Sequence, residues 1–377
     1  MSGFRKFVER AVLRAGLLLA AAALCGAAYA VVAGNLKQAQ NSAATANTLA
    51  SSAGGDEQSA FVEARRLSQV GKYDEAIAQL LELQSKNPVL PGLQRELGIA
   101  YYKKADYANA AKYLTAALEE NPPDQEATQL LGLSYYLGGH AAQAIPLLEK
   151  VQTWYASANV DAAYILGICY IQTKDYPKAR GAFARMFGVE AESAAAYLFT
   201  ARMLLRQDIA PVAEEYAVKA SALDAKLPLA HQLLGEVYLY QSKLPEAAAQ
   251  FQAEMAINPG YAAAYYKLAD AESRAQKFDD AEKLLQRSIW LDPTSTGPYI
   301  LLGKVLEKKG EADLAARALQ RALSMDPNNP IPHHLLGLTY RDLGRAEDAD
   351  RELKLAEQLQ SQSVQSNPMR SHPNEKP

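Results

Sequence analysis

Residues 71–80 read GKYDEAIAQL, and close variants of this string return along the chain. They are KADYANAAKYL at 104–114, TKDYPKARGAF at 173–183 and QKFDDAEKLL at 276–285. Each string combines an aromatic residue, an acidic or amide residue and an alanine in similar places. Self-similarity of this kind predicts a repeat architecture, whereas the length of 377 residues alone would suggest two or three globular domains.

The period of the repeat is clearest from one alanine in each string. This alanine recurs every 34 residues, with a single spacing of 35, at Ala76, Ala110, Ala144, Ala179, Ala213, Ala247, Ala281, Ala315 and Ala349. Leu-Gly pairs such as Leu97-Gly98 and Leu131-Gly132 keep the same spacing. We therefore expect nine repeats over residues 57–363, with one extra residue near Asn159.

Each repeat contains two amphipathic stretches of about a dozen residues, separated by a short polar turn. Pro177, Pro211 and Pro245 share one repeat position, at the expected start of the second stretch, where a helix tolerates proline. Small Gly and Ala residues at fixed places would let the two helices approach closely. One such hairpin cannot bury its apolar stripe alone, so neighbouring repeats are expected to stack.

This pattern resembles the tetratricopeptide repeat family, whose period is about 34 residues and whose consensus motif is L-G…Y…A…F…P. The tyrosine position of the family is held by Tyr101, Tyr135, Tyr170, Tyr238 and Tyr340. Repeat five, residues 194–227, departs most, because Thr200-Ala201 replace the Leu-Gly pair. The resemblance implies an all-α protein, a right-handed α-solenoid of about nine helical hairpins whose first helices line a concave groove.

The N-terminal 36 residues have the pattern of a targeting segment. Basic residues precede an uncharged run over residues 15–36. The apolar part of this run is followed by small residues at positions 28–30. A cleaved signal peptide and an uncleaved membrane anchor both fit, and a mitochondrial-type presequence is a third interpretation. A lipoprotein signal fits less well, because Leu24 stands directly before Cys25.

The first two interpretations place the rest of the chain outside the cytoplasm, in the periplasm or secreted, with a possible membrane tether through residues 15–36. Residues 37–56 are rich in Ala, Ser and Asn and predict a flexible linker. Residues 364–377 predict a disordered tail.

Composition and motifs argue against several classes of function. A net charge of −3 with no large Lys/Arg cluster disfavours nucleic-acid binding. A chain with only two cysteines cannot form a disulfide framework. The apolar neighbours of Cys169 predict that its side chain is buried in the core. We find no phosphate-binding loop, nucleophile motif or metal-binding set of histidines, and we interpret His231 and His333 as packing or surface residues. We therefore expect no enzyme activity, no cofactor, no metal and no small-molecule substrate.

The family resemblance places partner binding in the groove. The predicted groove residues are Tyr136, Tyr164, Ile168, Leu198, Arg202, Leu205, Arg206, Leu239, Tyr240 and Tyr266, with Leu137 and Ile171 beside them. An amphipathic helix or an extended peptide with apolar anchors and an acidic group near Arg202 would fit this stretch. In the alternative interpretation, tight coiling of the solenoid buries several of these side chains. Family members that clamp chaperone carboxylates use groove asparagines, which are absent from these positions.

These observations favour a non-enzymatic, extracytoplasmic scaffold that holds protein or peptide segments. By resemblance, envelope assembly, secretion or pilus biogenesis would be typical settings. A regulatory or substrate-presenting subunit of an enzyme, such as a glycosyltransferase or protease, is the alternative, and a purely structural spacer is a third interpretation. The repeat boundaries near 158, 193 and 227 lack the usual closing proline. Such irregular boundaries predict a weak joint in this region, and the alternative is sequence drift with intact packing.

Overall fold

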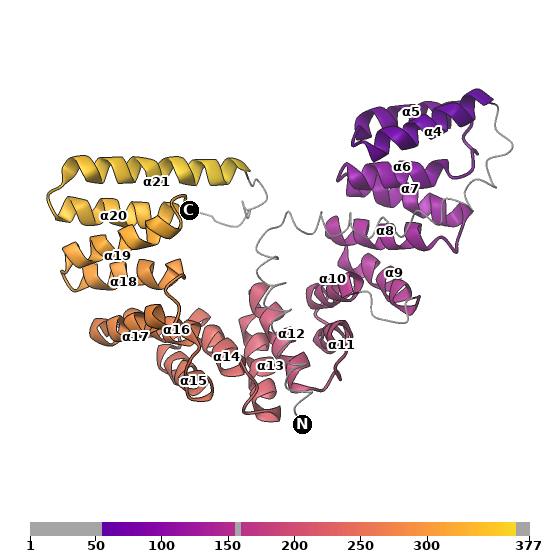
Figure 1. Ribbon diagram of the computed structural model, residues 1–377. Coiled ribbons are helices and arrows are strands. Elements are labelled where there is room, and N and C mark those ends of the chain that lie inside the picture. Colours follow the sequence, from indigo (N-terminus) through magenta and orange to yellow (C-terminus); the bar gives the residue numbers. More distant parts are fainter. Residues whose placement is uncertain (1–54, 155–159, 367–377) are drawn as a thin grey trace. The chain divides into compact units, whose positions relative to one another are not determined.

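The computed structural model describes residues 55–154 and 160–366, and within them it contains eighteen α-helices and no strand (Figure 1). The helices alternate between the first and the second helix of nine hairpins. The first helices are α4 (Gly55–Gln69), α6 (Leu93–Lys103), α8 (Gln125–Leu137), α10 (Val160–Gln172), α12 (Ala194–Arg206), α14 (Ala230–Tyr240), α16 (Ala262–Arg274), α18 (Thr296–Lys308) and α20 (Pro330–Asp342). The second helices are α5 (Tyr73–Lys86), α7 (Tyr107–Glu120), α9 (Ala141–Thr153), α11 (Tyr176–Phe187), α13 (Ala210–Leu223), α15 (Leu244–Ile257), α17 (Phe278–Leu291), α19 (Ala312–Met325) and α21 (Ala346–Ser366).

The expected repeat boundaries differ slightly from the observed ones at both ends. Helix α4 begins at Gly55, two residues before the predicted start, and α21 continues to Ser366, three residues into the predicted tail. The predicted targeting segment 1–36, most of the linker, Asn159 and residues 367–377 lie outside the described residues. Among the residues that are described, none of the helices has the length and apolar character that a membrane span needs.

Every hairpin turn contains one residue in the left-handed backbone region, always at the same repeat position. These residues are Gly71, Ala105, Gly139, Lys174, Asp208, Ser242, Gln276, Gly310 and Gly344, with φ between 58° and 84°. A left-handed residue reverses the chain direction tightly after a helix. The next residues start the second helix, where Pro177, Pro211 and Pro245 occupy its first turn as predicted.

The two helices of a hairpin approach closely where the Leu-Gly pair meets the second helix. A Cβ atom on Gly167 would lie 2.3 Å from Cε1 of Phe183, and one on Gly235 would lie 2.6 Å from Cε1 of Phe251. Phe183 and Phe251 are both fully buried. Glycine at this position therefore makes room for a large side chain in the core, as the sequence predicts.

The large side chain of the second helix also holds the next repeat. Phe251 of α15 belongs to the same core cluster as Leu268 of α16. Leu319 of α19 packs in one cluster with Leu336 and Tyr340 of α20. Within each unit, a hairpin thus buries its apolar stripe against the first helix that follows it in that unit, which is the nearest-neighbour stacking expected of a solenoid.

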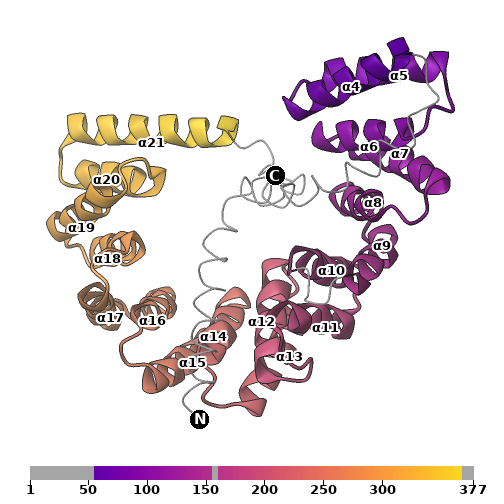
Figure 2. The same ribbon diagram turned by 45° about the vertical axis from the view of Figure 1, so that its right-hand side comes forward.

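The chain divides into two compact units, Met1–Ala191 and Glu192–Pro377. We call them the N-terminal unit and the C-terminal unit and describe each by itself. The division lies between α11 and α12, close to the repeat boundary near 193 for which the sequence predicts a weak joint. Figures 1 and 2 show the hairpins of each unit stacked in chain order.

Candidate functional site: the inner face of each unit

Within each unit, first helices of successive repeats contact one another. In the N-terminal unit α4 contacts α6 and α6 contacts α8, and in the C-terminal unit the contacts run from α12 through α14, α16 and α18 to α20. Contacts of this kind are more extensive between these first helices than between the second helices of neighbouring hairpins. The first helices therefore lie on the inside of the curve that the hairpins of a unit form. We call the solvent-facing side of these first helices the inner face of each unit.

In the N-terminal unit, the predicted groove residues divide between surface and core. Tyr136 on α8 and Tyr164 on α10 are half-buried, and the Tyr164 ring lies 6.2 Å from the Phe183 ring, centroid to centroid. Ile168 and Ile171 are only 4% and 1% exposed. These two isoleucines are core residues and do not contribute to the predicted groove surface, because the packing around α10 covers them.

In the C-terminal unit, α12 contributes Leu198, Arg202 and Leu205, which are half-buried, and Arg206, which is exposed. Leu239 on α14 is only 7% exposed and belongs to the core cluster of Phe251. The prediction of Leu239 as a groove residue therefore needs correction, since the next repeat covers its side chain.

Two predicted tyrosines of the C-terminal unit differ in their surroundings. Tyr240 is 55% exposed and donates a hydrogen bond to Oδ1 of Asp208 over 3.3 Å. The negative charge of Asp208 raises the pKa of the Tyr240 hydroxyl. Tyr266 is half-buried, and burial raises its pKa. Both hydroxyls stay protonated near neutral pH, so these side chains present a ring and a hydrogen-bonding tip.

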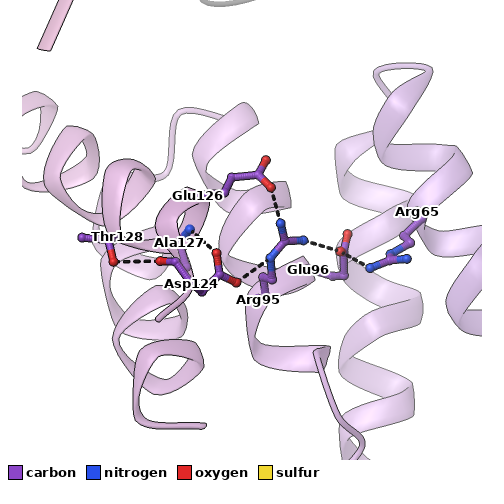
Figure 3. Close-up of polar contacts among 7 residues, drawn as sticks. All are labelled: Arg65, Arg95, Glu96, Asp124, Glu126, Ala127 and Thr128. Carbon is purple, nitrogen blue, oxygen red and sulfur yellow. Dashed lines mark hydrogen bonds and ion pairs between the residues drawn. The ribbon is translucent and has the colours of Figure 1, made fainter. Parts of the chain in front are cut away.

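A chain of ion pairs crosses the inner face of the N-terminal unit (Figure 3). Arg65 reaches from α4 to Glu96 on α6 with an Nη2–Oε1 distance of 2.7 Å. Arg95 donates to Asp124 over 2.9 Å, to Glu96 over 3.1 Å and also to Glu126 at the start of α8. Burial lowers the pKa of Arg95, but attraction by the three carboxylates outweighs it, so that the pKa is raised.

The repeat spacing explains these pairs. Arg65 and Glu96 are 31 residues apart, and so are Arg95 and Glu126, which places each arginine beside the next first helix. Glu236 and Lys267 of the C-terminal unit have the same separation and lie 3.7 Å apart. These partners were missed in the sequence analysis, although a search for opposite charges at an offset of 31 residues would have found them.

Arg202 and Arg206 lack such partners. The residues 31 positions after them, Leu233 and Val237, carry no charge, and Asp175, which stands 31 positions before Arg206, pairs with Lys178 of α11. Neither arginine forms an ion pair with any residue in the described part of the chain. The inner face of the C-terminal unit therefore carries two uncompensated guanidinium groups next to the half-buried Leu198 and Leu205.

The cysteine and histidines predicted to be structural are packed as expected. Cys169 is fully buried, and burial raises the pKa of its thiol to about 12. His333 is hydrogen-bonded to Glu352 over 2.5 Å, and His231 to Gln250 over 2.7 Å. Each of these bonds joins the two helices of one hairpin. Within residues 55–154 and 160–366, no group of His, Cys, Asp and Glu side chains could hold a metal ion.

Comparison with solved structures finds other helical-repeat proteins of low identity. A crystal structure of MamA is 22% identical over 44% of this chain and 96% of that chain, with a TM-score of 0.41. YrrB, described as a TPR protein with an unusual peptide-binding site, is 22% identical over 47% of this chain and 93% of that chain, with a TM-score of 0.39. The Cut9–Hcn1 structure is 17% identical over 71% of this chain and 52% of that chain, with a TM-score of 0.41. A comparison with curated proteins gave no match.

Comparison with family models is more specific. Models described as tetratricopeptide repeat match residues 61–124 and 233–297, residues 297–329 and residues 318–351. A model described as anaphase-promoting complex, cyclosome, subunit 3 matches residues 103–186. The matched segments lie in both units and follow the observed hairpins, so tetratricopeptide repeats occur in both units of this all-α chain.

Proposed function

We propose that this chain is a non-enzymatic scaffold that holds a peptide or protein segment on the inner face of its C-terminal unit. Solenoids of tetratricopeptide repeats typically serve as scaffolds for protein–protein interaction. The observation that carries the proposal is the pair Arg202 and Arg206 on α12, whose charges have no carboxylate partner in the described chain. An acidic group of a bound segment would supply that partner.

The surroundings of these arginines suit a segment that is both apolar and acidic. Leu198 and Leu205 on the same helix are half-buried and leave apolar surface for an anchor side chain. Tyr240 on α14 is 55% exposed. Tyrosine and arginine are the residue types that most often contribute large binding energies at interfaces. An amphipathic helix or an extended peptide with an acidic group near Arg202 fits this chemistry.

The N-terminal unit is less suited to an acidic group. Arg65 and Arg95 already pair with three carboxylates of their own unit, so a ligand carboxylate would meet Glu96 and Glu126 as well. Tyr136 and Tyr164 remain candidates for apolar and aromatic contacts. We therefore assign the acidic part of the ligand to the C-terminal unit.

A crosslinking pull-down with the full chain tests this proposal. The partner recovered with the wild type is assayed against the double variant Arg202→Gln/Arg206→Gln and against Arg317→Gln, which removes an exposed charge from the second helix α19. Because a charge-assisted hydrogen bond contributes about 1.5–3 kcal/mol, the double variant should bind at least about tenfold more weakly. Unchanged binding by the double variant would refute the assignment of the site.

The scaffold is proposed to work outside the cytoplasm, in a process such as envelope assembly, secretion or pilus biogenesis. The support is the basic segment before the uncharged run 15–36, which lies outside the described residues. A reporter that is active only outside the cytoplasm, fused after residue 56, should be active. Activity of a cytoplasmic reporter at the same position would overturn this location. Recovery of one stoichiometric enzyme in the pull-down would instead favour the regulatory-subunit alternative.

A further inference from the structure

The last repeat carries an open hollow of about 640 Å³ between α18, α20 and α21. We call it the terminal hollow. It is lined by Lys304, Pro330, Ile331, His334, Leu335, Leu353, Ala356, Glu357 and Gln360. The hollow lies wholly within the C-terminal unit, where the helices of the last two repeats meet.

The preceding repeat shows how the position equivalent to the terminal hollow is filled. Leu319 on α19 stands 34 residues before Leu353 on α21 and is fully buried, in a cluster with Leu336 of the next first helix. Leu353 packs on Gly337 of its own hairpin but is only half-buried. The terminal hollow is thus at the place equivalent to the one where the preceding hairpin, α18 and α19, receives α20.

Apolar and charged groups line this hollow together. Ile331 is 53% exposed, and it lines the hollow together with the half-buried Leu335 and Leu353, so that apolar surface gathers there. Lys304 and His334, on α18 and α20, are exposed on one side, and Glu357 on α21 is exposed on the other. Lys304 and Glu357 form no ion pair with any residue that the structure describes.

We propose that a second copy of this chain covers the terminal hollow, with α21 of each copy lying in the hollow of the other. A two-fold dimer brings the same patch of both copies together. The side of the hollow with Lys304 and His334 in one copy then faces α21, with Glu357, of the other copy. Lys304 of one copy then pairs with Glu357 of the other, while the two Ile331 and Leu353 surfaces bury each other. Helix α21 has 21 residues, against 14 in α19, and its greater length extends the contact.

Sedimentation of the full chain over a range of concentrations tests the dimer. We expect the wild type to self-associate reversibly and Ile331→Lys to weaken association at least about tenfold, because it buries a charge at the centre of the contact. The peptide binding proposed for Arg202 should persist in Ile331→Lys, which separates this inference from the proposed function. Circular dichroism of each variant verifies that it folds.

A charge-reversal pair makes the test specific. Glu357→Lys and Lys304→Glu should each weaken the dimer, because each places like charges opposite one another. The double variant restores opposite charges and should dimerise within about threefold of the wild type. Asp350→Lys, which changes an exposed carboxylate of α21 outside the hollow, is the matched control and should have no effect.

Two results would overturn the proposal. A full chain that stays monomeric at every concentration would mean that something else covers the hollow, whether residues 367–377 or a helix of another protein. A dimer that neither Ile331→Lys nor Glu357→Lys weakens would place the contact between copies elsewhere on the chain.

Discussion

At the scale of single residues, Glu254 shows how one buried carboxylate can cap the first helix of its own hairpin. Its side chain on α15 has no exposed surface and accepts hydrogen bonds from the backbone N–H groups of Leu229 (3.2 Å) and Gln232 (3.4 Å) at the start of α14. We expect Glu254→Ala to lower the free energy of unfolding by about 1–3 kcal/mol, because buried donors lose their partners. Urea denaturation measures this loss. Gln252→Ala, on the exposed side of α15, is the control, and equal midpoints for the two variants would contradict the prediction.

At the scale of the helical hairpin, the turns share one left-handed residue but not one residue type. Gly71 has φ of 84° with no atom near its missing Cβ, whereas Ala105 adopts φ of 65° at the same repeat position. We expect Gly71→Ala to destabilise the protein by about 1 kcal/mol and Ala105→Gly to stabilise it by about 0.5–1 kcal/mol, since only a residue with Cβ is strained there. Thermal denaturation of the two reciprocal variants checks the opposite signs. Shifts of the same sign would show that backbone strain does not control these turns.

At the scale of the whole molecule, the division between Ala191 and Glu192 predicts two unfolding steps. Repeat proteins are stabilised by interactions between neighbours, so an irregular boundary lets the parts unfold separately. In hydrogen exchange at increasing urea, helices α4–α11 and α12–α21 should lose protection at different concentrations. Glu254→Ala should shift only the step of the C-terminal unit. Simultaneous loss of protection over all described helices would contradict this prediction.

The repeat was predictable because its spacing follows from packing. The alanine that defines the period is fully buried in eight repeats and 3% exposed as Ala349 in the ninth. A position that meets another helix in every repeat accepts only a small side chain, so the constraint is visible in the sequence itself. The left-handed turns were harder to predict, because five of the nine use a residue other than glycine.

The candidate site was predictable only in part. Inner-face positions could be counted from the repeat, but Ile168 and Leu239 proved to be buried at 4% and 7% exposure. Whether an apolar side chain on a first helix is exposed depends on how closely the next hairpin packs, which varies from repeat to repeat. An offset of 31 residues relates Arg65 to Glu96 and Arg95 to Glu126, which do pair. The same offset relates Asp175 to Arg206, which forms no ion pair in the described chain, so the spacing alone does not distinguish paired arginines from unpaired ones.

The sequence by itself determined the all-α repeat architecture, the 34-residue period and the presence of nine hairpins, because these depend on local helix patterns and on small residues at fixed contacts. Only the tertiary structure decided which charges remain unpaired. Arg95 meets Glu96, Asp124 and Glu126, whereas Arg202 meets no carboxylate in the described chain. Ion pairs and burial are properties of neighbours in space, and those neighbours come from adjacent repeats once the helices have stacked.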